Sequence, residues 1–107
     1  MNLHFSPDGN KPEQPVLTVA GDIITANGEA HDFSDIPNGA TLPRSAITSE
    51  WILGPVERDE NGVLTVYGVV LPHGPNAPKA TRFPAPLENV ADGPVALPIY
   101  DAEETPA

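Results

Sequence analysis

Hydrophobic and polar residues alternate along two parts of the chain, and this alternation predicts strands rather than helices. The first part covers residues 16–33, where glycine-bearing turns at Gly21-Asp22 and Asn27-Gly28 separate three short segments. Because each tight turn reverses the chain, the pattern predicts a three-stranded antiparallel meander with Thr18 opposite Thr25. Side chains alternate with a period of two, so one face of this meander should carry Leu17, Val19, Ile24, His31 and Phe33.

The second part, from Glu50 to Leu71, predicts one long β-hairpin. Its two apolar segments flank Asp59-Glu60-Asn61-Gly62, a sequence that suits a type I turn followed by a left-handed residue. In the register that this turn favours, the facing pairs are Trp51 with Leu71, Leu53 with Val69, and Pro55 with Tyr67. Apolar residues occupy both faces, which predicts a strand pair covered on both sides or one face kept for a partner. Gly54 opposite Gly68 predicts a bend or a close approach of the two backbones.

The remaining segments predict an irregular outer layer. Leu3-His4-Phe5 suits a short strand followed by a turn over residues 6–10, and residues 45–47 suit a single helical turn. The chain has 14 prolines, which disfavour long helices and central strands. From Pro72 onward we expect an extended wrap over the sheet, anchored by Phe83, Leu87, Val90, Val95 and Leu97.

These elements predict an all-β fold, a small antiparallel meander or sandwich-like domain with a proline-rich C-terminal wrap. With 107 residues and no long apolar stretch, we expect one domain over residues 1–100. Residues 101–107 are acidic or small and should form a disordered tail.

The net charge of the chain disfavours two classes of partner. Fifteen acidic and five basic residues give a formal charge of -10, which repels nucleic acid and anionic membrane surfaces. No segment approaches the 20 or so apolar residues of a membrane span, and the N-terminus lacks the pattern of a signal peptide. The absence of cysteine excludes disulfides, thiolate metal sites and cysteine nucleophiles.

The sequence contains only weak signals of a catalytic or metal-binding site. No serine lies in a Gly-x-Ser-x-Gly elbow, and the exposed carboxylate pairs are poorly placed for acid-base work, so we expect neither an enzyme nor a cofactor. His31 and His73 with nearby carboxylates could build a small-ligand or metal site, but their spacing matches no template. His31 is also explained by packing on the apolar face with one ring nitrogen hydrogen-bonded.

An interaction surface is the strongest functional interpretation of the residues. Trp51, Tyr67 and Arg82 belong to the residue types that dominate binding hot spots, and Trp51 and Tyr67 could share one face of the hairpin. Trp51 is more simply explained as the largest packing unit of a small core. A thin core and an exposed strand edge also favour self-association into a homo-oligomer.

Several segments together resemble a group of small proteins encoded by tailed bacteriophages and proteobacterial prophages. They are Val19–Asp22, Gly28–Ser34, Gly39–Pro43, Glu50–Ile52, Leu71–Pro78, Arg82–Pro84 and Asp92–Val95. The resemblance spans nearly the whole chain, and it places such genes near those for tail and tail-fibre components.

The resemblance implies a structural or assembly role, with other phage tail proteins as partners. It carries no activity, cofactor or site residue over to this chain. The protein would lie in the bacterial cytoplasm during synthesis and could enter the virion. His73 and Asn76, polar residues of the Leu71–Pro78 segment, join Trp51, Tyr67 and Arg82 as candidate contact residues.

Overall fold

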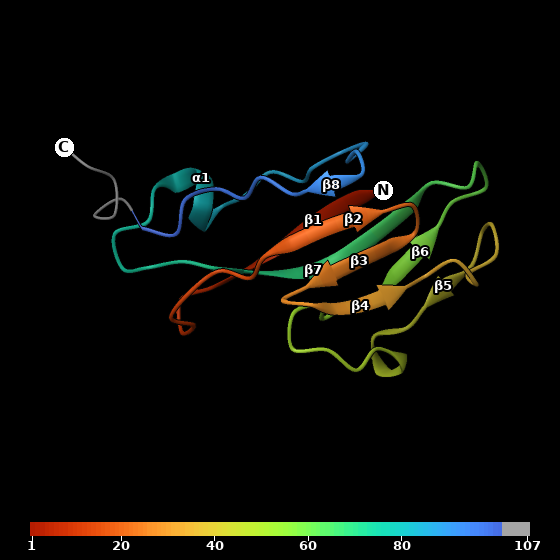
Figure 1. Ribbon diagram of the computed structural model, residues 1–107, viewed down its shortest axis with the longest axis horizontal. Coiled ribbons are helices and arrows are strands. Elements are labelled where there is room, and N and C mark those ends of the chain that lie inside the picture. The colour runs from red at the N-terminus through yellow and green to blue at the C-terminus, as the bar shows by residue number, and fades with distance from the viewer. Residues whose placement is uncertain (102–107) are drawn as a thin grey trace.

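The computed structural model describes residues 1–101, and these form two β-sheets packed as layers, with one short helix (Figure 1). The expected all-β fold is confirmed. The hairpin sheet has strand order β1-β7-β6-β5 and the meander sheet has order β4-β3-β2-β8. The strands are β1 (Asn2–Asp8), β2 (Leu17–Ala20), β3 (Ile23–Ala26), β4 (Glu29–Asp32), β5 (Thr41–Leu42), β6 (Val56–Arg58), β7 (Leu64–Pro72) and β8 (Gly93–Pro94).

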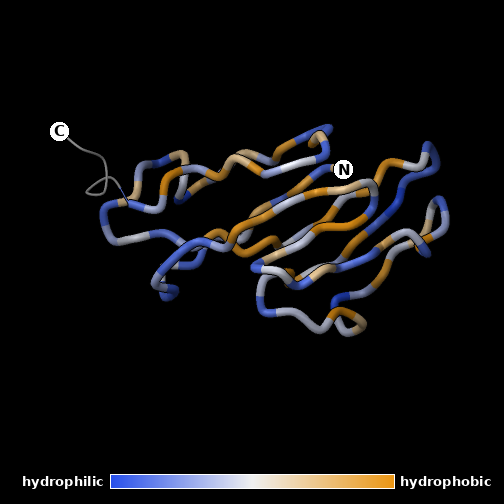
Figure 2. Tube along the Cα trace, viewed as in Figure 1, coloured by the Kyte–Doolittle hydropathy of each residue, from blue (hydrophilic) through white to orange (hydrophobic). Residues whose placement is uncertain are grey.

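The core lies between the two sheets. Figure 2 shows apolar positions concentrated along the strands and polar positions at the turns. Side chains from both sheets make one buried cluster, with Leu17, Val19 and Ile24 on the meander sheet and Leu3, Val56, Leu64 and Val66 on the hairpin sheet. No helix among residues 1–101 is long and apolar enough to cross a membrane.

The meander is formed as its turns predict. Strands β2, β3 and β4 pair in antiparallel order, and Thr18 lies opposite Thr25. Gly21 and Asn27 both have positive φ, at 59° and 49°, as primed two-residue turns require. Leu17, Val19, Ile24 and Phe33 are buried on one face, with His31 half-buried beside them.

The hairpin turn is also confirmed. The Gly62 N–H donates to the Asp59 carbonyl at 3.1 Å, and Gly62 has a φ of 85°. The Asp59 carboxylate accepts hydrogen bonds from the backbone N–H groups of Asn61 and Val63, both at 2.9 Å, and so satisfies two backbone donors inside the turn. Within the turn, side-chain and backbone bonds favour the same reversal.

The expected register holds near the turn and is wrong beyond Gly54. Val56 lies opposite Val66 as expected, but Ile52, not Leu53, lies opposite Val69. One extra residue is therefore inserted on the β6 side, and the expected Trp51–Leu71 and Leu53–Val69 pairs do not form. Gly54 and Gly68 have φ values of 61° and 69°, and a Cβ on Gly68 would lie 3.1 Å from the Gly54 nitrogen. The close backbone approach is thus confirmed.

Strand β1 departs from the expected fold. It pairs in parallel with β7, with Leu3 beside Val66 and Pro7 beside Leu71, so the sandwich is not wholly antiparallel. Residues 6–8, expected to begin a turn, continue this strand. Pro7 is tolerated because β1 is the edge strand of its sheet, where a missing N–H leaves no neighbour unpaired.

The C-terminal wrap is confirmed with one exception. Leu3 and Leu87 exchange backbone hydrogen bonds of 2.8 and 2.9 Å, and Val95 donates to the Leu17 carbonyl at 2.9 Å. Leu87, Val90, Val95 and Leu97 pack against the core as expected. Phe83 was expected to do the same, but its side chain is 74% exposed at the C-cap of the single helical turn α1 (Lys79–Arg82).

The smaller expectations have mixed outcomes. A 3₁₀ turn, η1 (Arg44–Ala46), replaces the helical turn expected at 45–47 with a shift of one residue. Asp101 is buried at 7% exposure, so the expected disordered tail does not begin there. Residues 102–107, the rest of that tail, lie outside the described residues.

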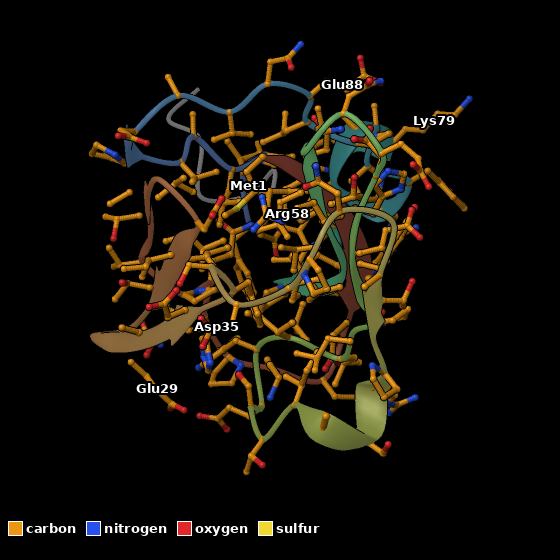
Figure 3. All side chains as sticks on the ribbon, turned by 90° about the vertical axis from the view of Figure 1, so that its right-hand side faces the viewer. Met1, Glu29, Asp35, Arg58, Lys79 and Glu88 are labelled. Carbon is orange, nitrogen blue, oxygen red and sulfur yellow. The ribbon has the colours of Figure 1, made fainter. Side chains whose placement is uncertain are left out.

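A guanidinium from β6 links the two sheets. The Arg58 side chain is 10% exposed and lies between the layers in Figure 3. Its donors reach the carbonyls of Ile36 (2.7 Å), Gly62 (3.0 Å) and Phe33 (3.1 Å) and the Asp22 carboxylate (3.0 Å). Arg58 of the hairpin sheet is thereby bonded to the β2–β3 turn and to the segment that follows β4.

Replacing Arg58 with methionine should destabilise the protein by about 3 kcal/mol, because it leaves three carbonyls and one carboxylate without their donor. Urea unfolding followed by Trp51 fluorescence measures this loss. Arg44→Met, at an exposed position, is the control and should stay within about 0.5 kcal/mol of the parent. Equal effects from the two variants would contradict the role of Arg58.

Two glycine-to-alanine variants separate backbone strain from crowding. Gly21 has positive φ with open space around it, so Gly21→Ala should cost about 1 kcal/mol from strain alone. Gly68 has a similar φ but faces the Gly54 backbone, so Gly68→Ala should cost at least about 1 kcal/mol more. Equal losses in urea unfolding would show that the bulge has room for a methyl group.

Candidate protein-contact site

The C-terminal wrap covers one side of the sandwich and leaves the other side open. Leu87 pairs with β1 and β8 pairs with β2, and both lie along the upper side of Figure 1. Strands β4 and β5 lie along the opposite side. Within residues 1–101, β4 pairs only with β3, and Glu29, Ala30 and Asp32 are exposed.

The outer edge of β4 presents unpaired backbone groups. The Phe33 N–H donates to the Asp22 carbonyl at 3.0 Å, which places Phe33 at a hydrogen-bonded position of the β3–β4 pair. Such positions recur at every second residue, so Ala30 and Asp32 direct their N–H and C=O groups away from β3. These four groups can accept a further strand.

A hollow of about 320 Å³ lies beside this edge, at the end of β4. We call it the edge pocket. Its walls are mostly apolar and come from the end of β4, the following turn and β5, namely Asp32, Phe33, Asp35, Ile36, Pro37, Ala40, Thr41 and Leu42. Phe33 and Ile36 also belong to the buried core, so the floor of the pocket is fixed by core packing.

Two acidic side chains line part of the edge pocket. Asp32 and Asp35 are among its lining residues, and none of those residues is basic. The Ser34 backbone N–H, helped by the Ser34 hydroxyl, holds the pKa of Asp32 below its ordinary value, so this carboxylate is ionised at neutral pH. Figure 3 shows Asp35 and Glu29 on the same side of the molecule. The site therefore combines apolar walls with a negative rim.

Trp51 and Tyr67 lie outside the edge pocket and have contacts of their own. Trp51 is half-buried and packs against the core cluster, with the Lys11 ammonium 4.9 Å from its ring centroid. Tyr67 donates to a Glu57 carboxylate oxygen at 2.7 Å, and its ring centroid lies 4.7 Å from that of His4.

The other candidate contact residues belong to α1 or to the segment that leads to it, at the end of the molecule where that helix projects (Figure 1). His73 is half-buried, with Nδ1 3.0 Å from the Gly74 carbonyl oxygen. Asn76 is exposed, and Arg82 donates to the Pro75 carbonyl at 2.8 Å beside the exposed Phe83. Arg82 thus contacts the residue before Asn76, and neither Asn76 nor Arg82 lines the edge pocket.

The two histidines of the alternative ligand site have separate surroundings. His31 stacks on Phe33 with ring centroids 6.4 Å apart, and its Nε2 lies 3.9 Å from a Glu29 carboxylate oxygen. That buried nitrogen has no hydrogen-bond partner within residues 1–101, contrary to the bonded ring expected from the sequence. No group of three or more potential metal ligands occurs in that range.

Comparison with known proteins adds no relative. No family model, curated protein or solved structure matches this chain.

The sequence pattern missed the edge pocket because its lining residues fall in a predicted turn. Residues 35–39 have the composition of a turn, and nothing in the alternation shows that the turn faces a gap between sheets. Ile36, an apolar residue inside that polar turn, is the one available signal. Arg58 was missed as well, although it shares the inward-facing alternation of Val56.

The hydrogen bond to Glu57 raises the pKa of Tyr67 above the ordinary phenol value of about 10. The neutral phenol is favoured in the folded state. The Glu57–Tyr67 hydrogen bond therefore stabilises the folded state fully below about pH 10. This stabilisation is lost as the pH rises through the pKa of Tyr67 in the folded state. Glu57→Gln should lower the Tyr67 pKa, as measured by ¹³C NMR of the tyrosine rings. Glu13→Gln is the control, and an unchanged pKa in Glu57→Gln would contradict the assignment.

Proposed function

We propose that this chain is a non-enzymatic accessory protein of a tailed phage or prophage that works by contact with other tail proteins. It acts as a minor tail or virion component, or as a tail-assembly factor. The resemblance of its segments to phage-encoded proteins supports the phage or prophage origin. The edge pocket beside the open outer edge of β4 supports action by protein contact, and this observation carries the proposal.

A contact role fits the geometry better than catalysis does. The pocket walls are mostly apolar, and the lining residues with ionisable side chains are two carboxylates near a surface turn. Apolar concavities beside open strand edges are recurring sites of peptide recognition. The same arrangement gives a partner both backbone hydrogen bonds and buried apolar contact.

The test is affinity capture from an induced culture of the bacterial strain that carries the gene, followed by mass spectrometry. Ala40 lines the edge pocket, so Ala40→Leu should fill the hollow and reduce the captured tail polypeptides by about tenfold. Ala80→Leu makes the same change at an exposed position of α1 and should capture as the parent does.

Recovery of tail polypeptides by the parent and by Ala80→Leu, with their loss in Ala40→Leu, would support the proposal. Recovery of host enzymes alone would overturn it. Equal recovery of tail polypeptides by all three proteins would place the contact elsewhere on the surface and remove the edge pocket as its basis. Circular dichroism and urea unfolding of each variant confirm that the fold is retained.

A further inference from the structure

The chemistry of the edge pocket specifies its occupant, and this inference rests on the proposed function. We infer that the site binds an extended segment of a partner protein, which adds to β4 as a fifth strand of the meander sheet. The segment places one apolar side chain in the edge pocket and lysine or arginine side chains at the alternate positions.

The backbone of β4 supports strand addition. Ala30 and Asp32 direct their N–H and C=O groups outward, and the exposure of both residues leaves the edge accessible. An added strand would continue the hydrogen-bond ladder at these two residues. Main-chain bonds of this kind give affinity, and side-chain pockets give specificity.

The alternation of side chains sets the pattern of the segment. On a sheet, neighbouring strands place residues of the same orientation side by side. Phe33 points toward the core and lines the edge pocket, so an inward-facing residue of the added strand enters the hollow. A hollow of about 320 Å³ accepts a leucine-sized or larger side chain.

A second inward position of the added strand would lie beside His31, two residues before Phe33. The buried Nε2 of His31 has no hydrogen-bond partner within residues 1–101. Buried polar atoms are nearly always satisfied in folded proteins and complexes. The His31 side chain is 10% exposed, and a small rotation of its ring would bring Nε2 to a hydroxyl side chain at this position of the segment.

The carboxylates beside β4 determine which side chains suit the outward-facing positions of the added strand. Asp32 faces the opposite side of β4 from His31 and Phe33, and it lines the edge pocket together with Asp35. Basic residues at alternate positions of the segment would therefore lie next to carboxylates. The alternative occupant, a second copy of this chain pairing through β4, would bring like charges together on a protein of charge -10.

The probe is a fluorescein-labelled peptide of seven residues, with lysine at the odd positions, leucine at the centre and threonine at the other two. Anisotropy measures its affinity for the full chain. Replacing the central leucine with serine should weaken binding by about tenfold or more. Replacing the lysines with glutamates should abolish it, and replacing both threonines with alanine should weaken it by a few fold.

Two N-methylated forms of the peptide test strand pairing itself. One carries methyl groups on the amides of the odd residues and the other on those of the even residues. Because only alternate residues bond to β4, one form should lose binding and the other should keep most of it. Equal affinities of the two forms would overturn the inference.

Matched protein variants locate the site. Asp32→Asn with Asp35→Asn should weaken binding of the lysine peptide several fold, whereas Glu13→Gln with Glu88→Gln removes the same charge elsewhere and should not. Ala40→Leu should weaken binding by about tenfold, and Ala80→Leu should not. Equal losses in the two charge variants would reveal non-specific attraction and overturn the inference. Self-association in sedimentation, abolished by Ala30→Pro but kept in Ala30→Val, would overturn it in favour of a second copy.

The inference and the proposed function can fail separately. Capture of tail polypeptides that depends on Ala40, with no binding of the lysine peptide, would overturn the inference and leave the proposed function intact. Pocket-dependent peptide binding without capture of any tail polypeptide would overturn the phage role and leave the recognition of a basic, extended segment.

Discussion

The Arg58 guanidinium is the interaction on which the open side of this sandwich depends. Burying a cation is costly, and the cost is offset only where its donors are satisfied. Arginine suits this place because its planar fork offers five N–H donors in fixed directions. Here four of its hydrogen bonds reach carbonyls and a carboxylate on three separate turns. The turn after β4 is thus held against the hairpin, and the wall of the edge pocket that contains Ile36 gains a fixed position.

The distribution of covered and open edges limits strand pairing between copies of this chain. The proline-rich wrap pairs with β1 and β2, and its prolines limit further strand addition on that side. On the other side, β4 is only four residues long and carries Glu29 and Asp32. Short length and charge are the usual protection of an exposed edge. The same carboxylates that discourage pairing between copies would favour a basic segment, so protection and selectivity have one physical origin.

Local signals predicted the parts of the fold that turns determine, and they failed where distant segments meet. The positive φ of Gly21 and Gly62 follows from turn chemistry, and both reversals formed as expected. The parallel pairing of β1 with β7 joins segments about 60 residues apart, for which no turn supplies a signal. The register beyond Gly54 also shifted, because alternation alone cannot show on which strand an extra residue is inserted. The expectation that Phe83 joins the core rests on hydrophobicity alone, and the side chain is exposed at the end of a helical turn that the sequence pattern does not indicate.

The edge pocket shares residues with the core, and this limits how its specificity can change. Phe33 and Ile36 are 5% and 8% exposed, and both line the hollow as well as the buried cluster. Truncating either would enlarge the pocket and also leave a cavity in a thin core, where each lost apolar contact costs on the order of 1 kcal/mol or more. Ala40, Thr41 and Leu42 line the other wall and are exposed or half-buried. Changes in the side chain that the pocket accepts should therefore arise at these more exposed positions, because substitutions there alter the shape of the pocket at a lower cost to the core than substitutions of Phe33 or Ile36.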